Sequence, residues 1–329
     1  MLQFKGLILV VMILPGKFIY LFGQPQERNS ASILYHPEFK EVMVYGGSAH
    51  SRSSIKMRDS IVWMWNGLRW KPYTTAPSIR SGAVLTYQAA TRKLVLIGGS
   101  FSYSREKSIR YTDTWEFDGT NWRQVSDATL PNHLFHTAGS YHPEERTVLL
   151  FGGFDPNAEQ LSNRTWIYDN TIWTVKSTQK NPAPRNLHCM FMDSQNNGVI
   201  VVGGDNMTPD GLRDMWIYRH GEWELIANNL PFKLIGQYCG TAIGMSGDYF
   251  FLRSSFHENI SEAWLWKGSS KQWKKLTATP PGPRNDPAIV YDEFRNRIVV
   301  FGGEIGIEST NEVWEFDLSS QRWAKVFPQ

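Results

Sequence analysis

The chain has 329 residues, of which 41% are hydrophobic and 20% are charged. This length and composition fit a single globular domain with a sizeable core. The formal net charge is only +3, far from the strongly basic balance with which proteins bind a phosphate backbone. Composition therefore argues against a nucleic-acid-binding protein, and no nucleic acid is expected among the partners.

The first segment of the chain is apolar. Residues 1–5 form a short basic start, Gly6 to Leu14 is an unbroken apolar run, and Lys17 interrupts the run before a second apolar patch. This order is typical of a secretory signal peptide. The alternative is an uncleaved membrane anchor, but a span needs about twenty apolar residues without an interrupting charge. We expect a signal peptide at residues 1–23, a secreted or periplasmic protein, and no stable membrane span after leader removal.

The fourteen tryptophans fall into three columns that recur about every fifty residues, a spacing that indicates internal repeats. The first column is Trp63, Trp115, Trp166, Trp216, Trp264 and Trp314, and the second is Trp70, Trp122, Trp173, Trp223, Trp273 and Trp323. A third, aromatic column follows two residues after the first and comprises Trp65, Phe117, Tyr168, Tyr218, Trp266 and Phe316. Both main columns are complete in six repeats.

An apolar run that closes on two glycines lies between successive tryptophan pairs, as in Leu96-Ile97-Gly98-Gly99. Five of the six repeats carry the glycine pair, and the fifth has Arg253-Ser254 in its place. Each repeat is predicted to form four short strands, because short apolar segments alternate with turn residues. In the second repeat these strands are residues 83–87, 93–97, 114–117 and 121–125.

The glycine pair, the Trp-x-aromatic motif and the further Trp closely resemble the kelch repeat family over roughly residues 28–327. The resemblance implies an all-β fold, a six-bladed kelch-type β-propeller with four antiparallel strands per blade. Radial packing buries each sheet between its neighbours. We expect one propeller at residues 24–329, with both end blades whole and ring closure by packing of their faces. Kelch propellers serve as oxidases, mutarotases, adhesion modules and protein adaptors, so the resemblance leaves function open.

Two cysteines, Cys189 and Cys239, occupy one position of the first strand in repeats four and five. Residues at equivalent positions point in the same rotational sense around the ring, so each cysteine should face the next blade and not its counterpart. We expect two small packing thiols, with a disulfide as the alternative.

Signatures of catalysis are mostly missing, since there is no Gly-x-Ser-x-Gly elbow, zinc helix, Cys-x-x-Cys or phosphate-binding glycine loop. The nearest approach to a metal cluster is His133, His136 and His142, with His188 one repeat further on. His142 shares its hairpin column with Asp193 and Asp292, which favours a structural role. We expect no metal and no cofactor.

Four of the six repeats carry an arginine at one position shortly before the first strand. Four residues before the small position of the first strand come Arg28, Arg80, Arg185 and Arg284, while repeats three and five have Leu134 and Ile235. These arginines should lie near one mouth of the central channel, where guanidinium groups can bind a carboxylate in a bidentate way. They are our candidate ligand-binding residues. The alternative is that each pairs with a carboxylate within the ring, such as Asp113, Asp214, Glu262 or Glu312.

The loops after the glycine pairs are the other candidate recognition surface, for example residues 48–58, 100–111 and 154–164, although they could equally be plain solvated connections. Three glycosylation sequons, at Asn163, Asn206 and Asn259, matter if the source is eukaryotic. We expect an exported binding module that recognises a glycan or protein ligand at the channel mouth and loop face, rather than an enzyme.

The alternative function is an enzyme similar to the periplasmic kelch mutarotases of acidic sugars. In such an enzyme the arginines would hold the substrate carboxylate, and a Glu or His in the pocket would move a proton. A carboxylate or histidine beside the arginines at the mouth would favour the enzyme.

Overall fold

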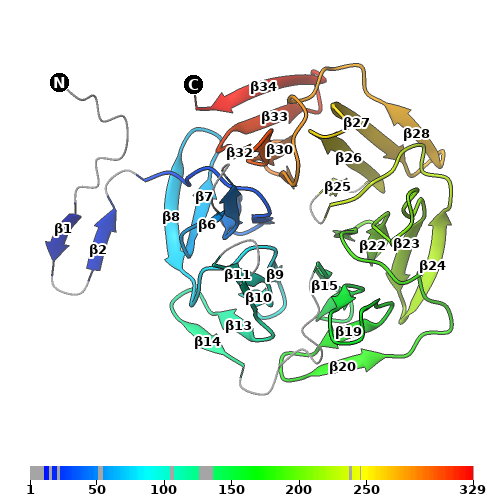
Figure 1. The fold of residues 1–329 in the computed structure, drawn as a ribbon, viewed down its shortest axis with the longest axis horizontal. Helices are drawn as coiled ribbons and strands as arrows, with labels where there is room; N and C mark the ends of the chain where they lie inside the picture. Colours follow the sequence, from blue (N-terminus) through cyan, green and yellow to red (C-terminus); the bar gives the residue numbers. More distant parts are fainter. Residues whose placement is uncertain are drawn as a thin grey trace.

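The structure is a computed structural model that describes residues 11–14, 17–20, 23–50, 55–103, 107–125, 136–236, 239–244 and 246–328. In this part of the chain the fold is all-β. Six four-stranded antiparallel sheets are arranged radially around a central axis, and Figure 1 shows them as the blades of a ring. The predicted six-bladed propeller is confirmed.

Each blade runs from its innermost to its outermost strand in chain order. Blade 1 comprises β3 (Ser32–His36), β4 (Glu41–Tyr45), β7 (Ile61–Trp65) and β8 (Trp70–Thr75); blade 2 comprises β9 (Val84–Gln88), β10 (Lys93–Ile97), β13 (Thr114–Phe117) and β14 (Trp122–Gln124). Blade 3 comprises β15 (Ala138–His142), β16 (Thr147–Phe151), β19 (Thr165–Tyr168) and β20 (Trp173–Lys176); blade 4 comprises β21 (Cys189–Asp193), β22 (Gly198–Val202), β23 (Met215–Arg219) and β24 (Glu222–Ala227). Blade 5 comprises β25 (Gly240–Ile243), β26 (Asp248–Ser255), β27 (Ile260–Lys267) and β28 (Gln272–Lys275); blade 6 comprises β29 (Ala288–Asp292), β30 (Arg297–Phe301), β33 (Val313–Asp317) and β34 (Arg322–Phe327).

The second strand of each blade forms the core. Residues 42–45, 148–151 and 199–202 are almost fully buried at every position. A strand covered on both faces reads as a continuous apolar run and not as an alternation. This is why the apolar runs before the glycine pairs are such clear signals in the sequence.

The tryptophan columns join neighbouring blades. Trp173 in blade 3 donates its indole N–H to Thr114 Oγ1 in blade 2 at 2.8 Å, and Trp223 in blade 4 donates to Thr165 Oγ1 in blade 3 at 2.9 Å. Each of these indole rings therefore satisfies its one polar group while it fills the space between two sheets.

The glycine pairs bend the chain out of the blade. At Gly203 φ is +62°, and an added Cβ would lie 2.5 Å from the carbonyl oxygen of Leu234 in the next blade. Glycine alone adopts this backbone freely and permits so close an approach. Beyond the pair, four blades form a separate small hairpin: β5 (Ser48–His50) with β6 (Ile55–Met57), β11 (Ser100–Ser102) with β12 (Ser108–Arg110), β17 (Phe154–Asp155) with β18 (Gln160–Leu161), and β31 (Glu304–Ile305) with β32 (Glu308–Ser309).

Blade 5 lacks this bend. With Arg253-Ser254 at the glycine position, β26 continues to Ser255 and pairs with β27 from Tyr249 to Ser255, so that Arg253 lies opposite Glu262 and Ser255 opposite Ile260. One long hairpin replaces the strand and separate small hairpin of blades 1, 2, 3 and 6.

The ring closes between blades 6 and 1 without a shared sheet, as the two whole end repeats predict. Closure involves more than face packing. Arg28 N donates to Thr310 O at 3.0 Å, Gly303 N donates to Arg28 O at 2.9 Å, and the Trp65 indole donates to Glu315 Oε1 at 2.9 Å. Backbone and side-chain hydrogen bonds therefore supplement the packing of the two faces.

The predicted signal peptide falls mostly on residues outside the described ranges. Within it, β1 (Val11–Leu14) and β2 (Lys17–Tyr20) pair as a hairpin that lies apart from the ring in Figure 1. The leader stays a prediction. Among the described residues, no helix is long and apolar enough to cross a bilayer.

Candidate functional site

The four candidate arginines have buried side chains with partners inside their own blades. Arg185 donates to both carboxylate oxygens of Asp214, at 2.7 and 2.8 Å, and to the carbonyl of Gly203 at 2.8 Å. The others repeat this pattern: Arg28 with Asp59 and Gly46, Arg80 with Asp113 and Gly98, and Arg284 with Glu312 and Gly302. The structure thus shows the internal pairing for all four.

The carboxylate of each arginine–carboxylate pair also accepts a hydrogen bond from a tryptophan. Trp216 donates its indole N–H to Asp214 at 2.7 Å, and Trp63, Trp115 and Trp314 do the same in their blades. Burial raises the pKa of Asp214, but the hydrogen bonds and charge of Arg185 and the hydrogen bond of Trp216 outweigh it and lower the pKa overall. Arginine, carboxylate and indole together tie the entry of the first strand to the third.

The two repeats without the arginine differ from this pattern in different ways. Repeat three, which has Leu134, carries the exposed Arg164 where the carboxylate should stand. In blade 5, which has Ile235, Glu262 instead contacts Lys275 at 2.6 Å and Arg253 at 3.7 Å. Every blade with the column arginine thus has a carboxylate partner for it, repeat three lacks both residues, and blade 5 keeps the carboxylate Glu262 but pairs it with other cations. A role for Arg28, Arg80, Arg185 and Arg284 in ligand binding stays a prediction.

A cavity of about 640 Å³ opens at the channel mouth on the face of the glycine-pair loops. The residue two positions after the arginine column forms its rim: Ser30, Gly82, His136, Leu187 and Asp286, all with φ between +48° and +62°. Hydrogen bonds run around this rim from blade to blade, from Ser30 N to Asp286 O, from Gly82 N to Ser30 O and from Leu187 N to His136 O. The four arginines are not among the described residues that line the cavity.

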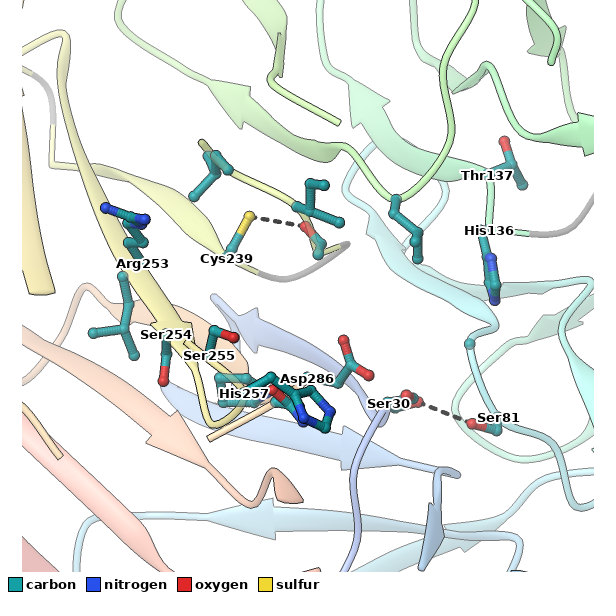
Figure 2. Close-up of a pocket in the computed structure, with 18 of the residues that line it drawn as sticks. Ser30, Ser81, His136, Thr137, Cys239, Arg253, Ser254, Ser255, His257 and Asp286 are labelled. Carbon is teal, nitrogen blue, oxygen red and sulfur yellow. Dashed lines mark hydrogen bonds between the residues drawn. The ribbon is translucent and has the colours of Figure 1, made fainter. Parts of the chain in front are cut away.

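Charged and titratable side chains line two sides of the cavity. Figure 2 shows Arg253, His257 and Asp286 on the side of blades 5 and 6, with His136 across the opening on blade 3. Burial lowers the pKa of His136, and the positive charge of Arg110 lowers it further. A neutral imidazole at this place can both donate and accept a hydrogen bond.

The long hairpin of blade 5 contributes the most side chains to the mouth. Arg253 is held by Glu258 at 3.0 Å, and the Ser254 hydroxyl accepts a hydrogen bond from Arg284 N at 2.9 Å. His257, Glu258 and Asp286 were not among the site residues predicted from the sequence. The loss of the glycine pair at Arg253-Ser254 was the available signal, because it removes the bend that turns the chain away in other blades.

Comparison with known proteins adds to this geometry. The family model of the kelch motif matches residues 287–327, the sixth repeat. Together with six radial four-stranded blades, this decides the family. The chain is a kelch-repeat β-propeller. Kelch propellers generally act as protein-binding modules.

Three curated relatives resemble the kelch propeller in sequence. Mei4-dependent protein 6 of Schizosaccharomyces pombe is 22% identical over 344 residues, 90% of this chain and 48% of the relative. Putative protein tag-53 of Caenorhabditis elegans is 30% identical over 31% of this chain and 8% of its own length. A leucine-zipper-like transcriptional regulator 1 homolog of Drosophila melanogaster is 24% identical over 63% of this chain and 23% of its own length. The chain spans about half the length of the first relative and less of the others.

The two thiols of the kelch propeller are buried and free. Cys189 Sγ lies 3.5 Å from the carbonyl oxygen of Gly240 in the next blade, as its predicted direction requires. Cys239 Sγ lies 2.8 Å from Gly236 O and lines the mouth cavity. Burial raises the pKa of Cys239, and a hydrogen bond with Cys189 raises it further. The two thiols are therefore neighbours, although we expected each cysteine to face the next blade and not its counterpart.

Of the four histidines considered as a metal cluster, the structure describes His136, His142 and His188. Within the described ranges, no group of three His, Cys, Asp or Glu side chains could hold a metal ion, and His133 lies outside these ranges. His142 is buried at its hairpin, where its Nδ1 accepts a hydrogen bond from Glu145 N at 3.2 Å. His188 is buried between blades against Gly152 and Gly204.

Proposed function

We propose that this kelch propeller is a protein-binding module whose docking surface is the loop face of blades 6, 1 and 2, beside the channel mouth. The small hairpins of these blades are in contact, β32 with β5 and β6 with β11. They therefore form one continuous surface, which we call the three-hairpin surface: β31–β32, β5–β6 and β11–β12.

Exposed apolar side chains on this surface carry the proposal. Ile305 and Ile307 project from blade 6, and Tyr103 and Ile109 from blade 2, with exposed fractions between 39% and 55%. Phe256, from the long hairpin of blade 5, lies 3.5 Å from the Cβ position of Gly306 and extends the apolar area to the mouth. Apolar side chains grouped beside a cavity are typical of protein interaction sites.

The mouth adds polar groups of both signs to this apolar area. Arg110, Lys233 and Arg253 line the cavity together with Glu258 and Asp286. An apolar area bordered by mixed charges resembles the core and rim of a protein interface. A polypeptide partner could therefore cover the three-hairpin surface and place a side chain in the cavity.

The test compares charge-introducing variants on the two faces of the ring. Partners captured by the wild-type chain are identified, purified and titrated by calorimetry against Ile109→Glu and Ile305→Glu. Leu68→Glu, whose position is 87% exposed in the turn between β7 and β8 at the opposite ends of the strands, is the matched control. We expect at least tenfold weaker binding with either loop-face variant and unchanged binding with the control. Equal binding by all variants, or loss with Leu68→Glu alone, would contradict the assignment.

A second candidate is the mutarotase-like enzyme acting on an acidic sugar. The observation that favours it is the presence of His136, His257, Glu258 and Asp286 around one cavity, since proton transfer needs such groups. A thermal-shift screen against acidic and neutral sugars, followed by NMR of anomer exchange, tests both this enzyme and a glycan-binding module. Stabilisation without faster exchange would indicate glycan binding alone.

Export completes the proposed function. The apolar run from Gly6 to Leu14 supports a cleaved leader and a secreted or periplasmic location. Amino-terminal sequencing of the mature protein should begin at Gln24. A mature protein that retains Met1 would contradict cleavage.

A further inference from the structure

The three sequons of the chain lie on one face of the ring. Asn163, Asn206 and Asn259 are each followed two residues later by Thr or Ser, and the sequence has no other such triplet. Each lies between the second and third strands of its blade, in blades 3, 4 and 5 respectively. Because these connections all open on the loop face, the three asparagines occupy one continuous half of it.

The side-chain amides are available for chemistry. Asn163 and Asn259 are exposed. Asn206 Oδ1 accepts hydrogen bonds from Thr208 N at 3.2 Å and Thr208 Oγ1 at 2.6 Å. This local turn uses only the oxygen and leaves Nδ2 of Asn206 unengaged.

We propose that Asn163, Asn206 and Asn259 are acceptors for N-linked glycans. The proposal rests on the export proposed above. In the reaction, asparagine Nδ2 loses a proton and forms a bond to the anomeric carbon of the sugar. The bond that breaks joins this carbon to the pyrophosphate of a lipid-linked oligosaccharide donor, which leaves as the lipid pyrophosphate.

The fold makes the three acceptors unequal, because the sequon needs its hydroxyl residue as well as its asparagine. Thr165 is fully buried, and its hydroxyl accepts the hydrogen bond of Trp223 at 2.9 Å. Ser261 donates to Pro281 O at 2.5 Å from within β27. Thr208, in contrast, lies exposed in the loop. Asn206 therefore stays accessible in the folded propeller, whereas Asn163 must be modified before blades 3 and 4 pack together.

Glycans at these positions would divide the loop face. Blades 3 to 5 would carry all the sugar, and the three-hairpin surface of blades 6, 1 and 2 contains no sequon. The sugar-free half is the half that carries Ile305, Ile307, Tyr103 and Ile109. Glycosylation would thus direct a protein partner to the proposed docking surface.

The first experiment separates glycosylation from export. One form of the chain keeps its own amino terminus, and a second has a known secretory signal fused ahead of Gln24; both are expressed in eukaryotic secretory cells and treated with peptide N-glycosidase. We expect three glycans in the second form, one fewer in each of Asn163→Gln, Asn206→Gln and Asn259→Gln, and three in the control Asn157→Gln. Asn157 is an exposed asparagine of the same loop as Asn163 but lies outside any sequon. No glycan in the second form overturns the acceptor assignment, whereas glycans in the second form alone overturn only export by the native leader.

The second experiment tests the effect of folding. Unglycosylated protein is produced in bacteria and prepared in two forms, one folded and one unfolded in urea and then rapidly diluted. Each form is incubated with an oligosaccharyltransferase and a lipid-linked oligosaccharide. We expect folded protein to be modified at Asn206 at least tenfold more than at Asn163, and this preference to be lost on unfolding. Equal modification of Asn163 and Asn206 in the folded protein would overturn the inequality of the acceptors.

Discussion

Arg185 donates to both carboxylate oxygens of Asp214 from a fully buried guanidinium group. The same guanidinium holds the carbonyl of Gly203, the first residue of the glycine pair. One side chain thus connects the first strand, the bend after the second strand and the residue that precedes the third strand. Because a buried charge that loses its partner is costly, removal of this connection should destabilise blade 4 strongly.

Replacing Arg185 should therefore destabilise the fold. Arg185→Ala leaves the Asp214 carboxylate and the Gly203 carbonyl without their main donor, and we expect a loss of about 3–5 kcal/mol in the free energy of unfolding. Urea denaturation measures this loss. Arg164→Ala, at the exposed arginine of blade 3, is the control and should change stability by less than about 0.5 kcal/mol.

The double variant Arg185→Leu/Asp214→Leu shows how much of the cost of losing Arg185 comes from the unpaired carboxylate of Asp214. If the cost of the single variant is mainly an unpaired buried carboxylate, the double variant should regain much of the lost stability. The same proteins test the ligand-binding prediction. Weaker binding of an acidic ligand at unchanged stability would favour the ligand role of the arginine column over the pairing described here.

The sequence predicts the blades well because each blade is made by local features that repeat. Apolar runs such as residues 199–202 and the two tryptophan columns fix strand order and packing without long-range information. The mouth of the channel could not be predicted in this way. Its lining depends on the direction of a side chain, as for Arg185, and on bends with positive φ at residues such as His136 and Asp286. Only the missing glycine pair at Arg253-Ser254 marked the asymmetric blade.

The glycine pair should tolerate no side chain. Gly203 and Gly119 both have positive φ, so Ala at either position costs about 1–2 kcal/mol in backbone strain. Only at Gly203 would the added Cβ meet a backbone carbonyl, at 2.5 Å, whereas nothing lies within 4 Å at Gly119. Overpacking should add about 1–3 kcal/mol to the cost of Gly203→Ala alone. Thermal or urea unfolding measures the loss of stability in Gly203→Ala and Gly119→Ala. Equal losses in the two variants would show that the backbone of the next blade moves away from the added Cβ at little cost.

The two thiols should be unreactive toward a thiol reagent in the folded protein and reactive in the unfolded protein. Cys189 and Cys239 are buried, and burial raises the pKa of Cys239, so little thiolate is present to react. We expect Ellman's reagent to detect two thiols after denaturation without reductant and almost none before it. Recovery of two thiols only after reduction would mean that the neighbours had formed a disulfide.

His188 should make the propeller sensitive to acid. Its ring is buried, neither nitrogen has a hydrogen-bond partner among the described residues, and burial followed by the charge of Arg185 lowers its pKa from 6.5 to about 3. Between these values the unfolded chain binds a proton that the folded chain does not, so stability falls as the pH drops below 6.5. At pH 5 the loss should be about 2 kcal/mol relative to neutral pH. The variant His188→Ala should remove this part of the pH dependence. Alanine is chosen because Ala31 and Ala83 occupy the equivalent positions of blades 1 and 2. The control His220→Ala, at an exposed histidine, should leave the pH dependence unchanged. Urea unfolding at pH 7.5 and pH 5 gives the comparison, and an unchanged difference in His188→Ala would assign the acid sensitivity to other groups.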